Sequence, residues 1–157
     1  MPSNKDWGPY LWIVLHTFAE KLGRQPNELM ALDEAREIVI ILKATEHIMP
    51  CEKCRKHYHE YLKKNPVDDF VQRRGEFLRQ AVRTWLWKLH EAVNERNGAP
   101  SFPIEEVTPK YQHTNTAQPL KELYTVLYSS IPLGFILSEP FKSFRRHVSL
   151  LRSLIGV

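Results

Sequence analysis

The sequence predicts an all-α protein: a four-helix bundle, followed by a short fifth helix and a helical C-terminal extension. Proline provides the first signal, because an interior proline removes a backbone hydrogen bond and breaks or kinks a helix. Apolar residues recur at helical spacing between the prolines, and the short connections favour an up-and-down bundle. In the first hundred residues four proline-free windows are each long enough for an amphipathic helix, and they are bounded by Pro9, Pro26, Pro50, Pro66 and Pro100.

The first two predicted helices have residues suited to helix termini at their ends. A helix over about Pro9–Leu22 places proline at its first position and Gly23 just after its end. A second helix starts after Asn27, a favourable N-cap residue, and runs to about Ile48. The apolar run at residues 38–42 predicts that this helix is deeply buried.

The third and fourth predicted helices complete the bundle. The third begins at Pro50 or Cys51 and ends before Asn65, because Pro66 follows. The fourth runs over about 75–96 and ends at Gly98, since glycine readily adopts the left-handed conformation of a helix C-terminus.

After Gly98 the sequence changes character. Closely spaced prolines and polar residues indicate a connector that contains one short helix at residues 104–111. The tail predicts two further short helices, of which the second is basic and amphipathic. We therefore assign residues 1–112 to the bundle and residues 113–157 to an extension without an assigned role. The break between the two tail helices is predicted at Pro132, Gly134 and Pro140.

Length and charge restrict the function classes. A chain of 157 residues suits a single domain with its own core. The net charge is +4, and the excess lies beside the two cysteines and in the tail. Such basic patches contact nucleic acid, anionic lipid or acidic partners in some proteins, but at this modest charge a solvated face is the commoner case. Nucleic acid is therefore not an expected partner, and neither a signal peptide nor a membrane span is predicted.

The only two cysteines, Cys51 and Cys54, stand at the predicted start of the third helix. A single C-x-x-C pair excludes a disulfide framework and leaves a redox or a metal role. Residues three apart in a helix have Cα atoms about 5 Å apart, within reach of a disulfide, and a helix N-terminus favours the reactive thiolate. The alternative is a zinc site completed by His57 with His59 or His47. The motif alone leaves both interpretations open.

Aromatic and imidazole groups on other helices favour the redox interpretation. Trp12 and His16 stand four residues apart on the first helix, and Trp87, His90 and Asn94 form one stripe on the fourth. Taken singly, each tryptophan is more often a core residue and each histidine an ordinary hydrogen-bonded one. Together they suit the lining of a planar cofactor, which a zinc site does not require.

Three segments resemble the Erv/ALR family of FAD-linked sulfhydryl oxidases, in the short form found in large DNA viruses. WGPYLWIVLH resembles the family's G-x-x-x-W-x-x-L-H, PCEKCRKHYHEYLKKNP its P-C-x-x-C-x-x-H, and WLWKLHEAVNERNG its W-x-x-x-x-H-N-x-V-N. Their order and separations also agree, over residues 7–111. The resemblance implies a helical bundle that holds FAD. It also implies a thiol oxidase that forms disulfides in substrate proteins and passes electrons through flavin to O2, giving H2O2.

The resemblance implies site residues position by position. Cys51 and Cys54 are the implied catalytic pair, with Cys54 beside the flavin and Cys51 exchanging with substrate. The helix start is expected to expose Cys51, whereas Cys54 turns inward with Tyr58 and Tyr61. Trp85 also matches a family tryptophan, but its apolar stripe predicts a core position. The implied cofactor-binding residues are Gly8, Trp12, His16, Cys54, His57, Tyr61, Trp87, His90, Val93 and Asn94.

Two departures from the family pattern concern the dinucleotide end of the site. Glu91 stands where the family prefers asparagine, and Ala99 stands where a lysine often reaches the phosphates. Other basic residues are candidates to neutralise the phosphates instead. These candidates are Lys63, Lys64, Arg83, Lys88 and Arg96.

The resemblance also implies partners and a location. It implies a homodimer built on the first two helices, with Leu29, Ile38 and Ile41 as candidate contacts. Expected partners are O2 and thiol-containing proteins, including a thioredoxin-like or viral dithiol protein, in the host cytoplasm or the virion. The alternative from another class is a zinc-stabilised helical binding module with a basic tail.

Overall fold

The computed structural model describes all 157 residues and confirms the all-α class, since it contains helices and no strand. Short 3₁₀ helices at Thr45–Ile48, Asp68–Gln72 and Ile104–Glu106 extend or connect the α-helices. None of the helices is both long enough and apolar enough to cross a membrane. The α-helices are α1 (Asn4–Lys21), α2 (Glu28–Ala44), α3 (Glu52–Lys64), α4 (Gly75–Asn97), α5 (Val107–Tyr111), α6 (Ala117–Ser130) and α7 (Ser138–Ile155).

Helix α1 begins at Asn4, earlier than predicted. The Ser3 hydroxyl accepts the Lys5 N–H, and the Asp6 carboxylate accepts the Ser3 N–H at 2.8 Å, so a capping box starts the helix. Pro9 therefore lies inside α1. The prediction that Pro9 occupies the first helical position is wrong, because a strong cap upstream offsets the one backbone hydrogen bond that proline removes.

The other predicted helix ends of the bundle agree closely with the structure. The Asn27 side chain caps α2 by accepting the Met30 N–H at 2.9 Å. Gly98 ends α4 with a φ of +67°. A further glycine pair brings two helix ends together: Gly23 has a φ of +83°, and a methyl group built on it would overlap the backbone carbonyl of Gly75.

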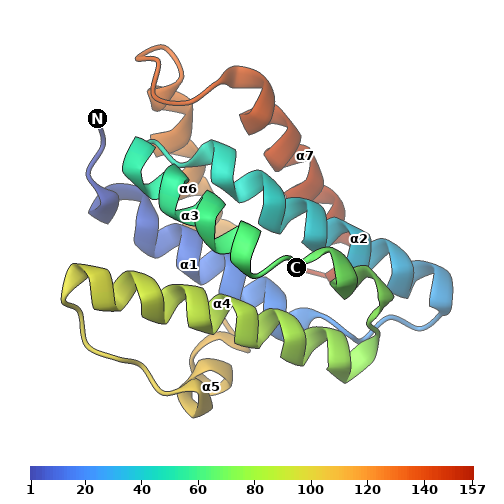
Figure 1. Ribbon diagram of the computed structural model, residues 1–157. Helices are drawn as coiled ribbons and strands as arrows, with labels where there is room; N and C mark the ends of the chain where they lie inside the picture. The colour runs from blue at the N-terminus through green and yellow to red at the C-terminus, as the bar shows by residue number, and fades with distance from the viewer.

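The tail forms two helices that pack against the bundle. In Figure 1, α1 runs between α4 and the α2–α3 pair, and α6 and α7 lie away from α4 and α5. Helix α6 contacts α1, and α7 contacts α2. Pro140 lies in the first turn of α7, where proline is tolerated. The break between the tail helices therefore comes from Pro132 and from Gly134, which has a φ of +79°, and the prediction that Pro140 contributes is wrong.

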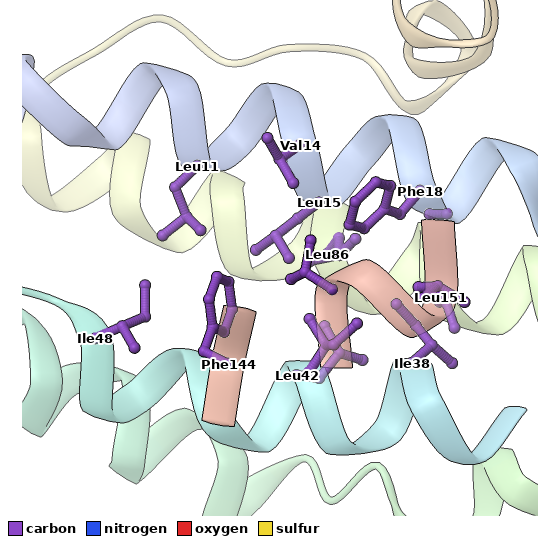
Figure 2. Packing of buried hydrophobic residues seen from close by; sticks show 14 of the residues in the cluster. Leu11, Val14, Leu15, Phe18, Ile38, Leu42, Ile48, Leu86, Phe144 and Leu151 are labelled. Atoms are coloured by element: carbon purple, nitrogen blue, oxygen red, sulfur yellow. The ribbon is translucent and has the colours of Figure 1, made fainter. Parts of the chain in front are cut away.

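The extension and the bundle share one continuous hydrophobic core. Figure 2 shows Phe144 and Leu151 of α7 in the same packed cluster as Ile48 and Ile38, and all four side chains are 0% exposed. Ile41 is also 0% exposed within the single chain. The prediction that Ile38 and Ile41 lie on a dimer surface is therefore wrong, because both side chains are buried inside the single chain.

Candidate functional site

The two cysteines form a disulfide at the N-terminus of α3. Cys51 is the N-cap residue, and its Sγ accepts the backbone N–H of Cys54 at 3.1 Å. The two Cα atoms lie 5.1 Å apart. The helical spacing thus places both sulfurs at the positively polarised end of the helix, as predicted, where a thiolate is stabilised.

The structure contradicts the predicted exposure of Cys51 but places Cys54 on the wall of a cavity with Tyr58 and Tyr61. Cys51 is only 7% exposed, because the preceding residues Ile48 and Met49 pack into the core and draw the start of α3 inward. Cys54 is half-buried, and its Sγ accepts the side-chain N–H of Asn4 at 3.4 Å. The expectation that the helix start exposes Cys51 is therefore wrong.

A cavity of about 500 Å³ lies between α1, α3 and α4, and the disulfide forms part of its wall. Two of the predicted cofactor-binding residues, His16 and Trp87, do not line it. The Trp87 indole instead donates to the carbonyl of Phe102 at 2.7 Å. The structure brings the other eight together on the cavity wall: Gly8, Trp12, Cys54, His57, Tyr61, His90, Val93 and Asn94.

His16 lies in a second layer behind the cavity wall. The Trp12 and His90 rings stack 3.9 Å apart on the wall, with an interplanar angle of 6°. Behind them, His16 Nε2 lies 3.1 Å from His90 Nδ1, and the His16 ring stacks on Tyr111. The i, i+4 spacing correctly predicted that Trp12 and His16 lie on the same side of α1. It could not predict that the His90 ring lies between His16 and the cavity.

Both imidazoles are neutral at physiological pH. Burial, followed by the electrostatic effects of His90 and Lys110, lowers the pKa of His16 to about 3. Burial and the charge of Lys110 lower the pKa of His90 to about 4. A neutral imidazole carries one N–H, so a single hydrogen bond joins the two rings and Nε2 of His90 remains available.

Aromatic packing holds α3 against α4 below the disulfide. Tyr61 donates its hydroxyl to the carbonyl of Trp85 at 3.1 Å, and the Trp85 indole donates to the carbonyl of Asn65 at 2.7 Å. Trp85 is 6% exposed, which confirms its predicted core position. Burial raises the pKa of Tyr61 to about 12, so its hydroxyl remains a donor.

Comparison with known proteins identifies the family. Residues 9–113 match the Erv1 / Alr family. The chain belongs to this family. The matched region contains the disulfide and nearly all of the cavity wall, and it stops before α6 and α7. No solved structure matches the chain significantly.

The relatives of this Erv1/Alr protein come from plants, yeast and large viruses. The FAD-linked sulfhydryl oxidase ERV1 of Oryza sativa subsp. japonica is 32% identical over 109 residues, covering 69% of the chain and 50% of the relative. A probable FAD-linked sulfhydryl oxidase of Acanthamoeba polyphaga mimivirus is 26% identical over 114 residues, covering 73% and 74%. The FAD-linked sulfhydryl oxidase of African swine fever virus (isolate Pig/Kenya/KEN-50/1950) is 29% identical over 90 residues, covering 57% and 66%. The chain spans about half the length of the plant relatives.

Positive charge surrounds the cavity of this Erv1/Alr protein, although mostly not from the predicted residues. Of the five basic candidates for phosphate contacts, only Arg96 lines the cavity, together with Lys5 and Lys53. Desolvation, and then the charges of Arg96 and Lys53, lower the pKa of His57. Lys5 was missed because α1 begins earlier than predicted, and the Ser3–Asp6 capping signal would have revealed it.

The two departures from the family pattern have different structural roles. The Glu91 carboxylate accepts the Phe102 N–H at 2.9 Å and the side-chain N–H of Asn94 at 3.3 Å, so it fastens the connector to α4. Hydrogen bonds, first from Ser101 and then from Phe102, lower the pKa of Glu91. Ala99 follows the end of α4 and does not line the cavity.

Arg83, one of the predicted phosphate contacts, belongs to an ion pair with a buried carboxylate. The Arg83 guanidinium makes two hydrogen bonds, of 2.6 and 2.9 Å, to Glu20, whose side chain is 1% exposed. Arg83 and Glu20 therefore form a structural ion pair.

The structure gives no support to the zinc alternative. No group of three or more His, Cys, Asp or Glu side chains is arranged to hold a metal ion. His59 contacts the Glu46 carboxylate at 2.7 Å, and the cysteines are bonded to each other.

Proposed function

We propose that this chain is an FAD-dependent thiol oxidase that forms disulfides in substrate proteins and delivers the electrons to O2. The observation that carries the proposal is the position of the Cys51–Cys54 disulfide on the wall of a cavity lined by stacked aromatic rings. A disulfide there can exchange with thiols on one side and meet a redox cofactor on the other. The names of the relatives, FAD-linked sulfhydryl oxidases, support the same chemistry.

The residues around the cavity fit FAD. A volume of about 500 Å³ lies within the usual range of cofactor sites. The Trp12–His90 stack offers a flat surface to a ring system, and Asn94 supplies polar groups at its edge. Lys5, Lys53 and Arg96 would neutralise the phosphates. When bound, the cofactor supplies a two-electron acceptor that reacts with O2 to give H2O2.

The thiol exchange requires only the residues of the chain and the substrate. A substrate thiolate attacks one sulfur of the disulfide, forms a mixed disulfide and releases the other sulfur as a thiolate. A second substrate thiolate then breaks the mixed disulfide, so that the substrate gains a disulfide and both cysteines are reduced. The N-terminus of α3 and the charge of Lys53 stabilise the thiolate.

We propose distinct roles for the two sulfurs, as the resemblance implies. Cys54 shares a wall of the cavity with His57 and Tyr61, its neighbours at i+3 and i+7, and this supports a place beside the cofactor. Cys51 is then the sulfur that exchanges with substrate. Because Cys51 is 7% exposed, attack on it requires movement of the residues that cover the start of α3.

Visible spectroscopy of the purified protein tests the proposal. We expect a yellow protein with one non-covalent FAD per chain, which oxidises a dithiol and releases one H2O2 per disulfide formed. Cys51→Ser should show a long-wavelength charge-transfer band from the Cys54 thiolate, whereas Cys54→Ser should retain FAD but lack this band. Colourless protein with stoichiometric zinc would instead support the binding-module alternative.

A matched pair of histidine variants tests the position of the cofactor. His90→Ala removes a ring of the cavity wall, so it should lower FAD content. His47→Ala changes an exposed side chain outside the cavity and should not. Equal FAD content in the two variants would contradict the proposed site.

The partners and the location are also proposals. We propose that the substrates are thiol proteins, including a thioredoxin-like or viral dithiol protein, in the host cytoplasm or the virion; the viral relatives support this setting. A homodimer remains a prediction. Its surface would include Leu29, which is 70% exposed, rather than Ile38 and Ile41. Sedimentation of monomer alone at micromolar concentration would contradict the dimer.

A further inference from the structure

A second cavity, of about 400 Å³, lies in the extension between α6 and α7. It shares no residue with the redox cavity, and it lies outside the part of the chain that matches the family. Four of its seven lining residues are cationic and none is acidic. We call this cavity the α6–α7 pocket. Its lining residues are Tyr124, Lys142, Arg145, Arg146, Val148, Ser149 and Arg152.

Packing holds the cationic residues in place. Phe141, Phe144 and Leu151 anchor α7 in the core at 0–1% exposure, so the rotation of the helix is set. Positions 142, 145, 146, 149 and 152 then fall on one side of α7. Like charges at such spacing repel each other, so the pocket is destabilising unless an anion neutralises it. The only acidic partner in the structure is Glu139, which meets Lys142 at 3.4 Å in a largely exposed pair.

Two of the residues that line the pocket carry a buried donor without a partner. Arg152 Nε and the Tyr124 hydroxyl are buried atoms that make no hydrogen bond within the chain. A buried donor left unpaired costs about 1–3 kcal/mol, so two in one pocket call for an explanation. Burial raises the pKa of Tyr124 to about 12, so its hydroxyl keeps its proton.

The rim of the pocket is partly preorganised. The Arg145 guanidinium carbon lies 5.1 Å from the centre of the Tyr124 ring and 5.7 Å from that of Phe141, which restrains the side chain through cation–π contacts. Lys142, Arg145 and Arg146 are exposed and can close over a ligand. The arrangement therefore combines two buried, unpaired donors with exposed positive charges.

We propose that the α6–α7 pocket binds a ligand carrying two or more phosphate groups. Guanidinium groups pair with phosphate oxygens through two parallel hydrogen bonds, and the tyrosine hydroxyl and Arg152 Nε supply further donors. The pocket lining contains four cationic side chains and no acidic side chain, which matches a multiply charged anion better than a single carboxylate. A compact pocket, rather than a long basic stripe, matches a small phosphorylated molecule or a phosphorylated lipid headgroup better than a nucleic acid.

Calorimetric titration of the cofactor-loaded 157-residue chain with pyrophosphate tests the proposal. We expect saturable 1:1 binding that weakens with increasing salt. Arg152→Gln should weaken binding by about tenfold or more, as expected on losing a charge-assisted hydrogen bond. Arg152→Lys keeps the charge but loses the Nε donor and should give an intermediate loss. Arg36→Gln, which removes an exposed cation of α2, is the control and should bind as the wild type does.

Further arms of the experiment identify the source of the phosphate groups. Sedimentation with phosphatidylcholine vesicles, with and without a phosphoinositide, separates a lipid headgroup from a free ligand, and either result supports the pocket. Circular dichroism checks that the variants fold, and unchanged thiol oxidation would show that the pocket is separate from the redox site. Absence of saturable binding to both pyrophosphate and vesicles would overturn the proposal. Equal loss in Arg36→Gln, or binding to DNA that tightens with its length, would overturn it too.

Discussion

Replacement of Phe144 by alanine tests whether the extension belongs to the fold of the redox domain. Phe144 is 0% exposed and lies in the same core cluster as Ile48, and α7 contacts the 3₁₀ helix Thr45–Ile48 that precedes Cys51. Truncating a buried phenylalanine costs about 3–5 kcal/mol in lost transfer energy and cavity formation. Domains of this size unfold with about 5–15 kcal/mol in total. Phe144→Ala should therefore remove about a fifth or more of the stability of the whole protein.

Urea denaturation followed by two probes measures this effect. Far-UV circular dichroism reports all helices, and flavin absorbance reports the cavity between α1, α3 and α4. Because the core is continuous, both probes should give the same lowered midpoint in Phe144→Ala. Leu150→Ala is the matched control, since Leu150 lies on the same helix and is 47% exposed. Its stability should stay within about 0.5 kcal/mol of the wild type.

Two results would refute this reasoning. The first is a loss below about 1 kcal/mol in Phe144→Ala, which would mean that α7 adds little to the core. The second is an early transition seen by circular dichroism alone, with the flavin signal unchanged. That result would make residues 113–157 an independent unit, attached to a redox domain that is stable without it.

Three further predictions concern the bundle. Gly23→Ala should destabilise the protein more than Gly98→Ala in the same denaturation assay: both glycines have positive φ, +83° and +67°, but only at Gly23 would the methyl group overlap a backbone carbonyl. Burial lowers the pKa of His16 to about 3 and of His90 to about 4, below the value of about 6.5 in an unfolded chain. The folded state then binds fewer protons, so stability should fall as the pH drops from about 6.5 toward 4, and His90→Gln should flatten this slope. Glu20→Gln leaves a guanidinium without its buried carboxylate and should cost about 3–5 kcal/mol, whereas an unchanged midpoint would contradict a stabilising ion pair.

Helix positions were largely predictable because their signals are local. Prolines, the Asn27 cap and the Gly98 terminus act within one or two turns, and the structure uses the cap and the terminus as predicted. The error at Pro9 has the same local origin: two competing signals lay close together, and the Ser3 capping box was the stronger. The candidate site was predictable where a residue type and a helix face were sufficient, as for Trp12, which lines the cavity.

The spacing of residues along a helix did not predict whether a side chain lines the cavity or lies behind its wall. His16 shares a side of α1 with Trp12, yet the ring of His90 stands between it and the cavity. Trp87 shares a stripe with His90, yet its indole turns to the carbonyl of Phe102. Helical periodicity gives the direction of a side chain from its own axis, and only the neighbouring helix decides what that side chain meets.

The sequence by itself determined the all-α class, the C-x-x-C pair at a helix N-terminus and the three motifs that identify the family, because each depends on residues close together in the chain. Tertiary structure alone decided that Cys51 is more buried than Cys54 and that Ile38 and Ile41 are buried inside the single chain. It also assembled the α6–α7 pocket from two helices. These features depend on contacts between segments far apart in sequence. Such contacts follow from how the apolar faces of all the helices fill one core, which no local pattern specifies.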